Sequence, residues 1–302
     1  MMKRSILSAC GVLGLWTSTV AAEPASYATP YDAMEAMIAG LQAENRDALM
    51  VVFGEEAADY LADEDPVENQ INRLALLALY GEGYRLVPEE DGTVSIALGS
   101  EGWTFPVPIA KTGDGMWSFD NEAGREEVTA REIGRNEIDV IELLEAYVAI
   151  QSEFRQTDYD KDGVMEFAQQ IISSSLEAPD GLFWPSRDTI MGELFARASA
   201  TGFNDGEDDR EPEPYVGYYF RILTAQGEAA PGGAMDYVIN GNMVAGHALL
   251  AVPAEYGETG VHSFMVSENG VLLEAVLGDE TLEVAAGIDA YNPTEEWTPV
   301  EE

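Results

Sequence analysis

The sequence predicts an α+β protein with two parts, residues 29–134 and 135–302. Three observations predict this fold class. Apolar residues at the start of each part recur three or four positions apart, which is the helical period. Further along each part they gather in short runs separated by Gly-containing turns, which is typical of antiparallel strands. Helices that precede strands, rather than alternate with them, favour an α+β arrangement.

The first part is expected to begin with three helices. Thr29 is suited to the N-cap of the first, Pro30 to its first turn, and Asp32 to a capping box. The second helix is expected to end at Gly54, and the third to span about 67–77. Strands are expected at 84–87, 93–98, 103–109 and 116–119. Three helices followed by such a sheet predict a cone-like domain.

The second part is expected to open with a long helix packed on an antiparallel sheet. Asn136 is the predicted N-cap, with Asp139 at the third helical position. An acidic loop at 158–166 follows, and then a helix to about Ile172. Asn269-Gly270 is a strong hairpin signal. Further elements are a short helix at 189–199, strands at 215–223, 243–252, 262–267 and 270–276, and a helix around 281–289.

The first residues predict export. Two basic residues come first, residues 5–20 carry no charge, and Ala22 ends a run of small residues. Residues 1–22 are therefore expected to be a cleavable signal peptide. The mature protein is expected to be periplasmic or secreted, with no transmembrane segment. The alternative is a lipoprotein anchored at Cys10, because the four residues ending there match a lipobox.

The composition excludes several kinds of partner and chemistry. The formal net charge is −41, from 56 acidic and 15 basic residues, so nucleic acid and anionic membranes would repel the protein. Cys10 is the single cysteine, so a chain without its signal peptide has no disulfide, thiol nucleophile or zinc–thiolate site. The acidity indicates either an adaptation to salty surroundings or affinity for divalent cations.

The sharpest local signal is the acidic loop. Three aspartates at alternate positions can turn their carboxylates toward one cation, and Gly163 permits the turn. Hard oxygen ligands of this kind suit Ca²⁺. Gln169 stands where an EF-hand has a bidentate glutamate, which predicts weak affinity. The alternative is a solvated acidic loop between helices. The predicted calcium ligands are Asp158, Asp160, Asp162, the carbonyl of Val164, and Glu166.

Catalytic patterns are sparse. The two histidines, His247 and His262, are expected to lie beside apolar strand neighbours, as structural rather than catalytic groups. The sequence contains no Gly-x-Ser-x-Gly elbow, no His-Glu-x-x-His pair and no phosphate loop. A hydrolase that uses two carboxylates stays open as an alternative, because 56 acidic residues single out no pair.

Three other features have two interpretations each. The Ala-Pro-Gly-Gly-Ala run at 230–234 is a tight turn or a backbone nest for an anion. The aromatic residues at 215–220, with Trp184 and Tyr237, belong to a sheet core or to a binding face. Arg131 and Arg135 pair with internal carboxylates or bind an anionic ligand.

A series of short motifs covers nearly the whole mature chain: WSFD at 117–120, REIGRNE at 131–137, DYDKDG at 158–163, EFA at 166–168, DGLFWP at 180–185, GYYFRILTAQG at 217–227, APGGA at 230–234 and PAEYG at 253–257. Together they resemble the bacterial family known as domain of unknown function 2950, which implies a secreted protein without an assigned activity. In architecture the second part is similar to the soluble head of type IV pilins and pseudopilins. The first part looks like the cystatin or nuclear-transport-factor-2 cone. These likenesses imply fold alone.

The expected function is that of a non-catalytic, exported cell-envelope protein, a binding or assembly module with a structural calcium loop and an unknown envelope protein or ligand as partner. The alternatives are a carboxylate-based periplasmic hydrolase and a pilin-like assembly component. An enzyme is expected to show a deep cleft with two facing carboxylates. A binding module is expected to show an exposed apolar patch or an open aromatic groove.

Overall fold

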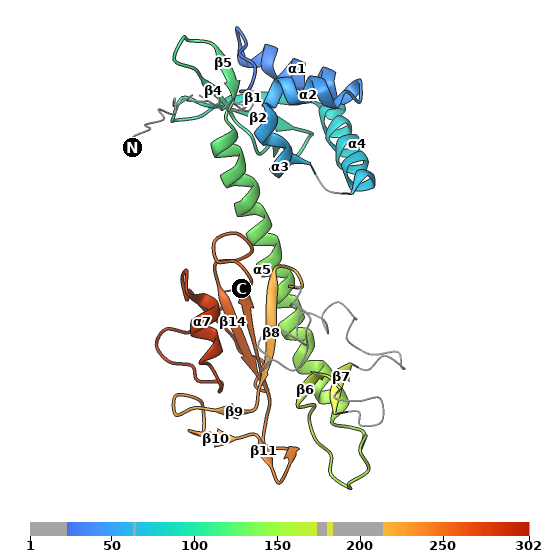
Figure 1. Ribbon diagram of the computed structural model, residues 1–302, viewed down its shortest axis with the longest axis vertical. Coiled ribbons are helices and arrows are strands. Elements are labelled where there is room, and N and C mark those ends of the chain that lie inside the picture. Colours follow the sequence, from blue (N-terminus) through green and yellow to red (C-terminus); the bar gives the residue numbers. More distant parts are fainter. Residues whose placement is uncertain (1–22, 63–64, 174–179, 184–213, 302) are drawn as a thin grey trace, which may run out of the picture. The chain divides into compact units, whose positions relative to one another are not determined.

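The computed structural model describes residues 23–62, 65–173, 180–183 and 214–301 (Figure 1). They form two compact units that divide between Val128 and Thr129, where the sequence had suggested 134/135. Helices and antiparallel sheets in both units confirm the predicted α+β class. The expected signal peptide, the expected helix at 189–199 and Trp184-Pro185 lie outside the described residues.

The first helix of the first unit begins where its capping signals predict. Thr29 accepts a hydrogen bond from the Asp32 N–H, as an N-cap side chain does. The Asp32 carboxylate accepts from the Thr29 hydroxyl, whereas in a full capping box it would accept from the Thr29 backbone N–H. Gly54 ends the second helix in a conformation with φ 82° that favours glycine. The helices are α1 (Pro30–Gln42), α2 (Arg46–Phe53), α3 (Ala58–Leu61) and α4 (Pro66–Glu82), with a 3₁₀ turn at Glu55–Ala57.

The sheet of the first unit is antiparallel, in the order β1-β2-β4-β5, with β3 paired to β2. Its core joins α1 and α2 to the inner face of the strands, with Met34, Phe53 and Ile96 buried together. The expected strand at 103–109 is divided in two around Pro106 and Pro108, because proline has no N–H for a ladder. The strands are β1 (Tyr84–Pro88), β2 (Val94–Leu98), β3 (Trp103–Thr104), β4 (Ile109–Lys111) and β5 (Trp117–Phe119).

Helix α5 (Asn121–Phe154) is the long helix, and it begins well before the expected start. Asp120 accepts a hydrogen bond from the Ala123 N–H at 3.2 Å, as a capping side chain does. The prediction that Asn136 is the N-cap is wrong, because this residue lies within the helix. The Asn136 side chain instead donates to the Thr259 carbonyl at 3.0 Å and so fastens the helix to a distant loop.

The main sheet of the second unit has five antiparallel strands in the order β16-β15-β14-β13-β8. The part of α5 after Thr129 packs on one face, where Leu144 and Tyr147 meet Phe220 (Figure 1). A second core covers the other face, so all six residues of β13 are buried. The strands are β8 (Tyr218–Leu223), β13 (Ala248–Pro253), β14 (Ser263–Ser267), β15 (Leu272–Ala275) and β16 (Thr298–Pro299).

Smaller elements surround this sheet. The Asn269-Gly270 hairpin is confirmed, since β14 and β15 pair on either side of it, and the final helix is α7 (Thr281–Ala286). The prediction of a helix ending at about Ile172 is wrong: the chain there forms β6 (Gln170–Ile172), which pairs in parallel with β7 (Gly181–Phe183). Two ribbons complete the unit, β9 (Ala225–Gln226) with β10 (Met235–Asp236) and β11 (Val238–Ile239) with β12 (Asn242–Met243).

Candidate functional site

The acidic loop that follows α5 brings its three aspartates together. One carboxylate oxygen each from Asp158, Asp160 and Asp162 lies within 4.8 Å of the other two. Asp158 is half-buried, whereas Asp160 and Asp162 are exposed. Three oxygens at this spacing can approach one cation together, so this part of the predicted ligand set has a geometry suited to a metal ion.

Backbone N–H groups hold these carboxylates in place. The Asp162 N–H donates to Asp160 Oδ1 at 3.2 Å, the Gly163 N–H donates to Asp158 Oδ2 at 3.1 Å, and the Val164 N–H donates to Asp162 Oδ1 at 2.7 Å. Lys161 and Gly163 have positive φ angles of 64° and 92°, which turn the chain around the carboxylates. The loop therefore curves around the three carboxylates, as the alternate spacing of its aspartates predicts.

One oxygen in the loop has no hydrogen-bond partner among the described residues. Asp158 Oδ1 is sealed from solvent and accepts no hydrogen bond from the described residues. A buried acceptor without a donor is costly, and neighbouring carboxylates add like-charge repulsion. A cation placed among the three aspartates would relieve both costs. Nothing in this geometry selects one metal over another.

Glu166 lies outside the group of three and has a different role in the structure. Its Oε2 accepts from the Met243 N–H at 3.0 Å and from Gln169 Nε2 at 3.3 Å. Burial raises the pKa of Glu166, and the charges of Asp160 and Asp162 raise it further, whereas these two hydrogen bonds lower it. Glu166 thus fastens the loop to the ribbon of β11 and β12.

The same ribbon supplies a residue that the sequence analysis missed. Asn242 Nδ2 donates to Asp162 Oδ2 at 2.6 Å, and the Phe167 N–H donates to the Met243 carbonyl at 2.8 Å. Asn240 and Gly241 form the turn of this ribbon with φ angles of 56° and 96°. An Asn-Gly pair is the usual hairpin signal, so the pair at 240–241 could have revealed the ribbon, although not its contact with the loop.

His247 has the apolar neighbours expected of it, whereas His262 faces a carboxylate. His247 is buried, with its ring edge-on to Tyr147 and Phe167, and its Nδ1 has no hydrogen-bond partner among the described residues. Burial, with a smaller contribution from Arg155, lowers the pKa of His247 to about 4. His262 is half-buried, and its Nδ1 lies 3.1 Å from Glu137 Oε2.

The aromatic residues of β8 differ in burial. Tyr218 and Phe220 are buried in the sheet core, whereas Tyr219 is half-buried. The run at 230–234 forms a turn in which the Gly233 N–H donates to the Ala230 carbonyl at 2.9 Å. Both observations favour the structural interpretations of these segments.

Helix α4 has an unusual outer face. Its residues Val67, Ile71 and Leu74 are 63%, 52% and 52% exposed, and no residue of the helix is fully buried. Positions 67, 71 and 74 lie on one side of a helix. Together they form an exposed apolar stripe in a strongly acidic chain, which is the kind of surface that marks a contact site.

These features define a class of protein: a two-unit α+β chain with an acidic, cation-competent loop at the end of its long helix. The chain belongs to the family described as protein of unknown function DUF2950, whose model matches residues 24–300. No curated protein and no solved structure matches the chain. The expected likeness of the second part to pilins is therefore not confirmed. Among the described residues, no helix combines the length and apolar character of a membrane span.

Proposed function

We propose that this protein is an exported, non-catalytic component of the cell envelope that binds a partner, and that its 158–166 loop holds a structural Ca²⁺ ion. The observation that carries the calcium proposal is the group Asp158, Asp160 and Asp162, with one buried oxygen that has no hydrogen-bond partner among the described residues. Export rests on the signal-peptide pattern of residues 1–22.

Calcium is proposed in preference to magnesium on the general ligand preferences of the two ions. Ca²⁺ accepts six to eight oxygen ligands in flexible geometry, whereas Mg²⁺ demands a near-ideal octahedron. The three aspartates, the Val164 carbonyl and solvent are the proposed ligands. Glu166 contributes through its second oxygen or through water. Gln169 lacks a carboxylate and donates to the Gly241 carbonyl instead, so the expected dissociation constant is on the order of 10⁻⁴–10⁻³ M.

The proposed role of the ion is mechanical. Asp162 is bound to Asn242, and Glu166 to the Met243 N–H, so an ordered loop holds the end of α5 to the β11–β12 ribbon. Without a cation the three carboxylates repel one another and favour an open loop. The ion therefore stabilises the second unit and carries out no chemistry.

A binding role is favoured by the α4 stripe. Three large apolar side chains on one helix face are costly to expose, and such patches mark contacts with other macromolecules. The expected partner surface is apolar, because the stripe formed by Val67, Ile71 and Leu74 carries no charge.

Thermal unfolding tests the calcium proposal. The melting temperature is expected to rise when millimolar Ca²⁺ is added to metal-free protein, because a ligand that binds only the folded state stabilises it. Asp160→Ala is expected to lose this gain. Magnesium at equal ionic strength controls for screening of the −41 charge. Equal gains for wild type and variant with both ions would contradict the proposal.

A further inference from the structure

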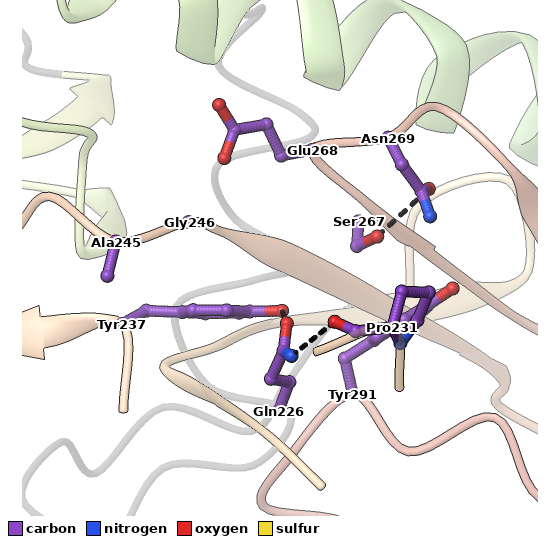
Figure 2. A pocket seen from close by; sticks show the side chains of 9 residues that line it. All are labelled: Gln226, Pro231, Tyr237, Ala245, Gly246, Ser267, Glu268, Asn269 and Tyr291. Carbon is purple, nitrogen blue, oxygen red and sulfur yellow. Dashed lines mark hydrogen bonds between the residues drawn. The ribbon is translucent and has the colours of Figure 1, made fainter. Parts of the chain in front are cut away.

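The second unit also contains a pocket that is separate from the proposed calcium loop. The pocket has a volume of about 280 Å³ and lies beside the end of β14. Four chain segments meet around it, and Figure 2 shows their side chains. It is lined by Gln226, Pro231, Tyr237, Ala245, Gly246, Ser267, Glu268, Asn269 and Tyr291. Its volume is close to the lower limit of about 300 Å³ for small-molecule sites, so it fits a ligand of one small ring.

Several polar groups of the wall are already paired with one another. Gln226 Nε2 donates to the Pro231 and Gly233 carbonyls at 2.9 and 2.7 Å, and its Oε1 accepts from the Tyr237 hydroxyl at 3.1 Å. The Ser267 hydroxyl donates to Asn269 Oδ1 at 3.0 Å (Figure 2). These contacts fix the wall in place, and they leave the Tyr237 and Ser267 oxygens able only to accept further hydrogen bonds.

Other groups of the wall have unused capacity. Asn269 Nδ2 and the Tyr291 hydroxyl make no hydrogen bond within the described residues, although Asn269 Oδ1 accepts from Ser267 and from the Val271 N–H. Among the described residues, the Glu268 carboxylate forms one ion pair, with Arg155 at 3.9 Å. Burial raises the pKa of Tyr237 to about 12, and the nearby Tyr291 and Glu268 add to the shift, so Tyr237 is neutral at physiological pH.

This inventory of donors and acceptors restricts the ligand. The free Asn269 amide nitrogen can only donate, so the ligand must supply an acceptor. The Glu268 carboxylate can only accept, so the ligand must also supply a donor. An ammonium group offers donors alone. An anion would meet Glu268, and the described residues of the wall include no cationic side chain. Hydroxyl groups both donate and accept, and they carry no charge.

We infer that this pocket binds a neutral, polyhydroxylated ligand of about one sugar ring. Hydroxyls of the ligand pair with Glu268, Asn269 and Tyr291, while the tyrosine rings contact its C–H groups. This site is distinct from the calcium loop, and its test does not depend on calcium binding.

The experiment is a chemical-shift titration of ¹⁵N-labelled protein with four probes: glucose, N-acetylglucosamine, glucosamine and glucuronate, at concentrations of tens of millimolar. At least one neutral sugar is expected to shift the amide signals of Gly246 and Asn269, whereas glucuronate is expected to leave them unchanged. If neither neutral sugar shifts these signals, the inference is wrong. Stronger binding of glucosamine than of both neutral sugars would also overturn it, because charge rather than hydroxyl pairing would then explain the site.

Two conservative variants locate the site. Tyr291→Phe removes one hydroxyl and keeps the ring, and Asn269→Asp removes the amide donor while keeping the Oδ1 acceptor of the turn. Each is expected to weaken binding about threefold to tenfold, the effect of one neutral hydrogen bond. The matched controls are Tyr256→Phe, which removes a hydroxyl elsewhere, and Asn72→Asp, which adds the same charge on α4. Equal affinities for all four variants would contradict this location.

Discussion

Replacing Gln151 by methionine is expected to destabilise the protein by about 2–6 kcal/mol. Gln151 is fully buried in α5, and its side chain makes three hydrogen bonds. Its Nε2 donates to the Ala168 carbonyl at 2.9 Å and to the Tyr147 hydroxyl at 3.0 Å, and its Oε1 accepts from the Ala168 N–H at 2.9 Å. Methionine conserves the volume and pairs with none of these groups.

The magnitude follows from the groups left behind. A buried backbone group without a partner costs about 1–3 kcal/mol, and the variant leaves both the N–H and the carbonyl of Ala168 unpaired. The Tyr147 hydroxyl retains the Ala248 carbonyl at 3.3 Å and adds little. The change in volume adds little as well, so the two Ala168 groups account for most of the estimate.

Urea unfolding followed by circular dichroism measures the effect. The matched control is Gln156→Met. Gln156 is exposed just after the end of α5, and its side chain donates to the Ser152 carbonyl. This control is expected to change the free energy of unfolding by no more than about 0.5 kcal/mol. If the two variants unfold at the same urea concentration, the argument that Gln151 anchors the strand after the acidic loop is refuted.

Three further outcomes are expected. Because burial lowers the pKa of His247 to about 4, the unfolded chain binds a proton that the folded chain does not between about pH 6.5 and 4, so stability falls as the pH falls. This contribution reaches about 3 kcal/mol at 1.36 kcal/mol per pKa unit, and His247→Leu should remove it from the urea-unfolding profile against pH. Ile71→Glu is expected to abolish cross-linking to an envelope partner with little change in stability. Its control is Val276→Glu, which adds the same charge at a similarly exposed position. Equal cross-linking of both variants would exclude the α4 stripe as the contact site. N-terminal sequencing of the exported protein should find Glu23 first, whereas a lipid-modified start at Cys10 would show an anchored lipoprotein.

Local signals predicted much of the fold because they are short-range. Thr29 with Asp32, the helix-ending Gly54 and the Asn269-Gly270 turn each act within a few residues, and the structure has each element where they indicate. The start of α5 was missed because residues 121–135 are mostly polar and Asn136 is itself a good cap. An amphipathic stripe is visible only where the helix packs on the sheet, after Ile138.

Long-range contacts explain the other differences. Residues 166–172 have helical propensity. However, the Phe167 N–H donates a hydrogen bond to the Met243 carbonyl, and β6 pairs with β7, so tertiary pairing overrides the local preference. The alternate aspartates were recognisable because their geometry depends on one loop. The contribution of Asn242 could not be recognised in the sequence, because its hydrogen bond to Asp162 joins residues 80 positions apart.

Calorimetric titration of Ca²⁺ into metal-free protein tests the central proposal most directly. The proposal predicts one site with a dissociation constant on the order of 10⁻⁴–10⁻³ M, and weaker or no binding of Mg²⁺. Asp160→Asn is expected to abolish this binding, whereas Asp236→Asn, which removes the same charge from exposed strand β10, is expected to leave it unchanged. Absence of a saturable calcium signal, or an equal loss in both variants, would contradict the proposal and leave the 158–166 loop as a solvated acidic turn.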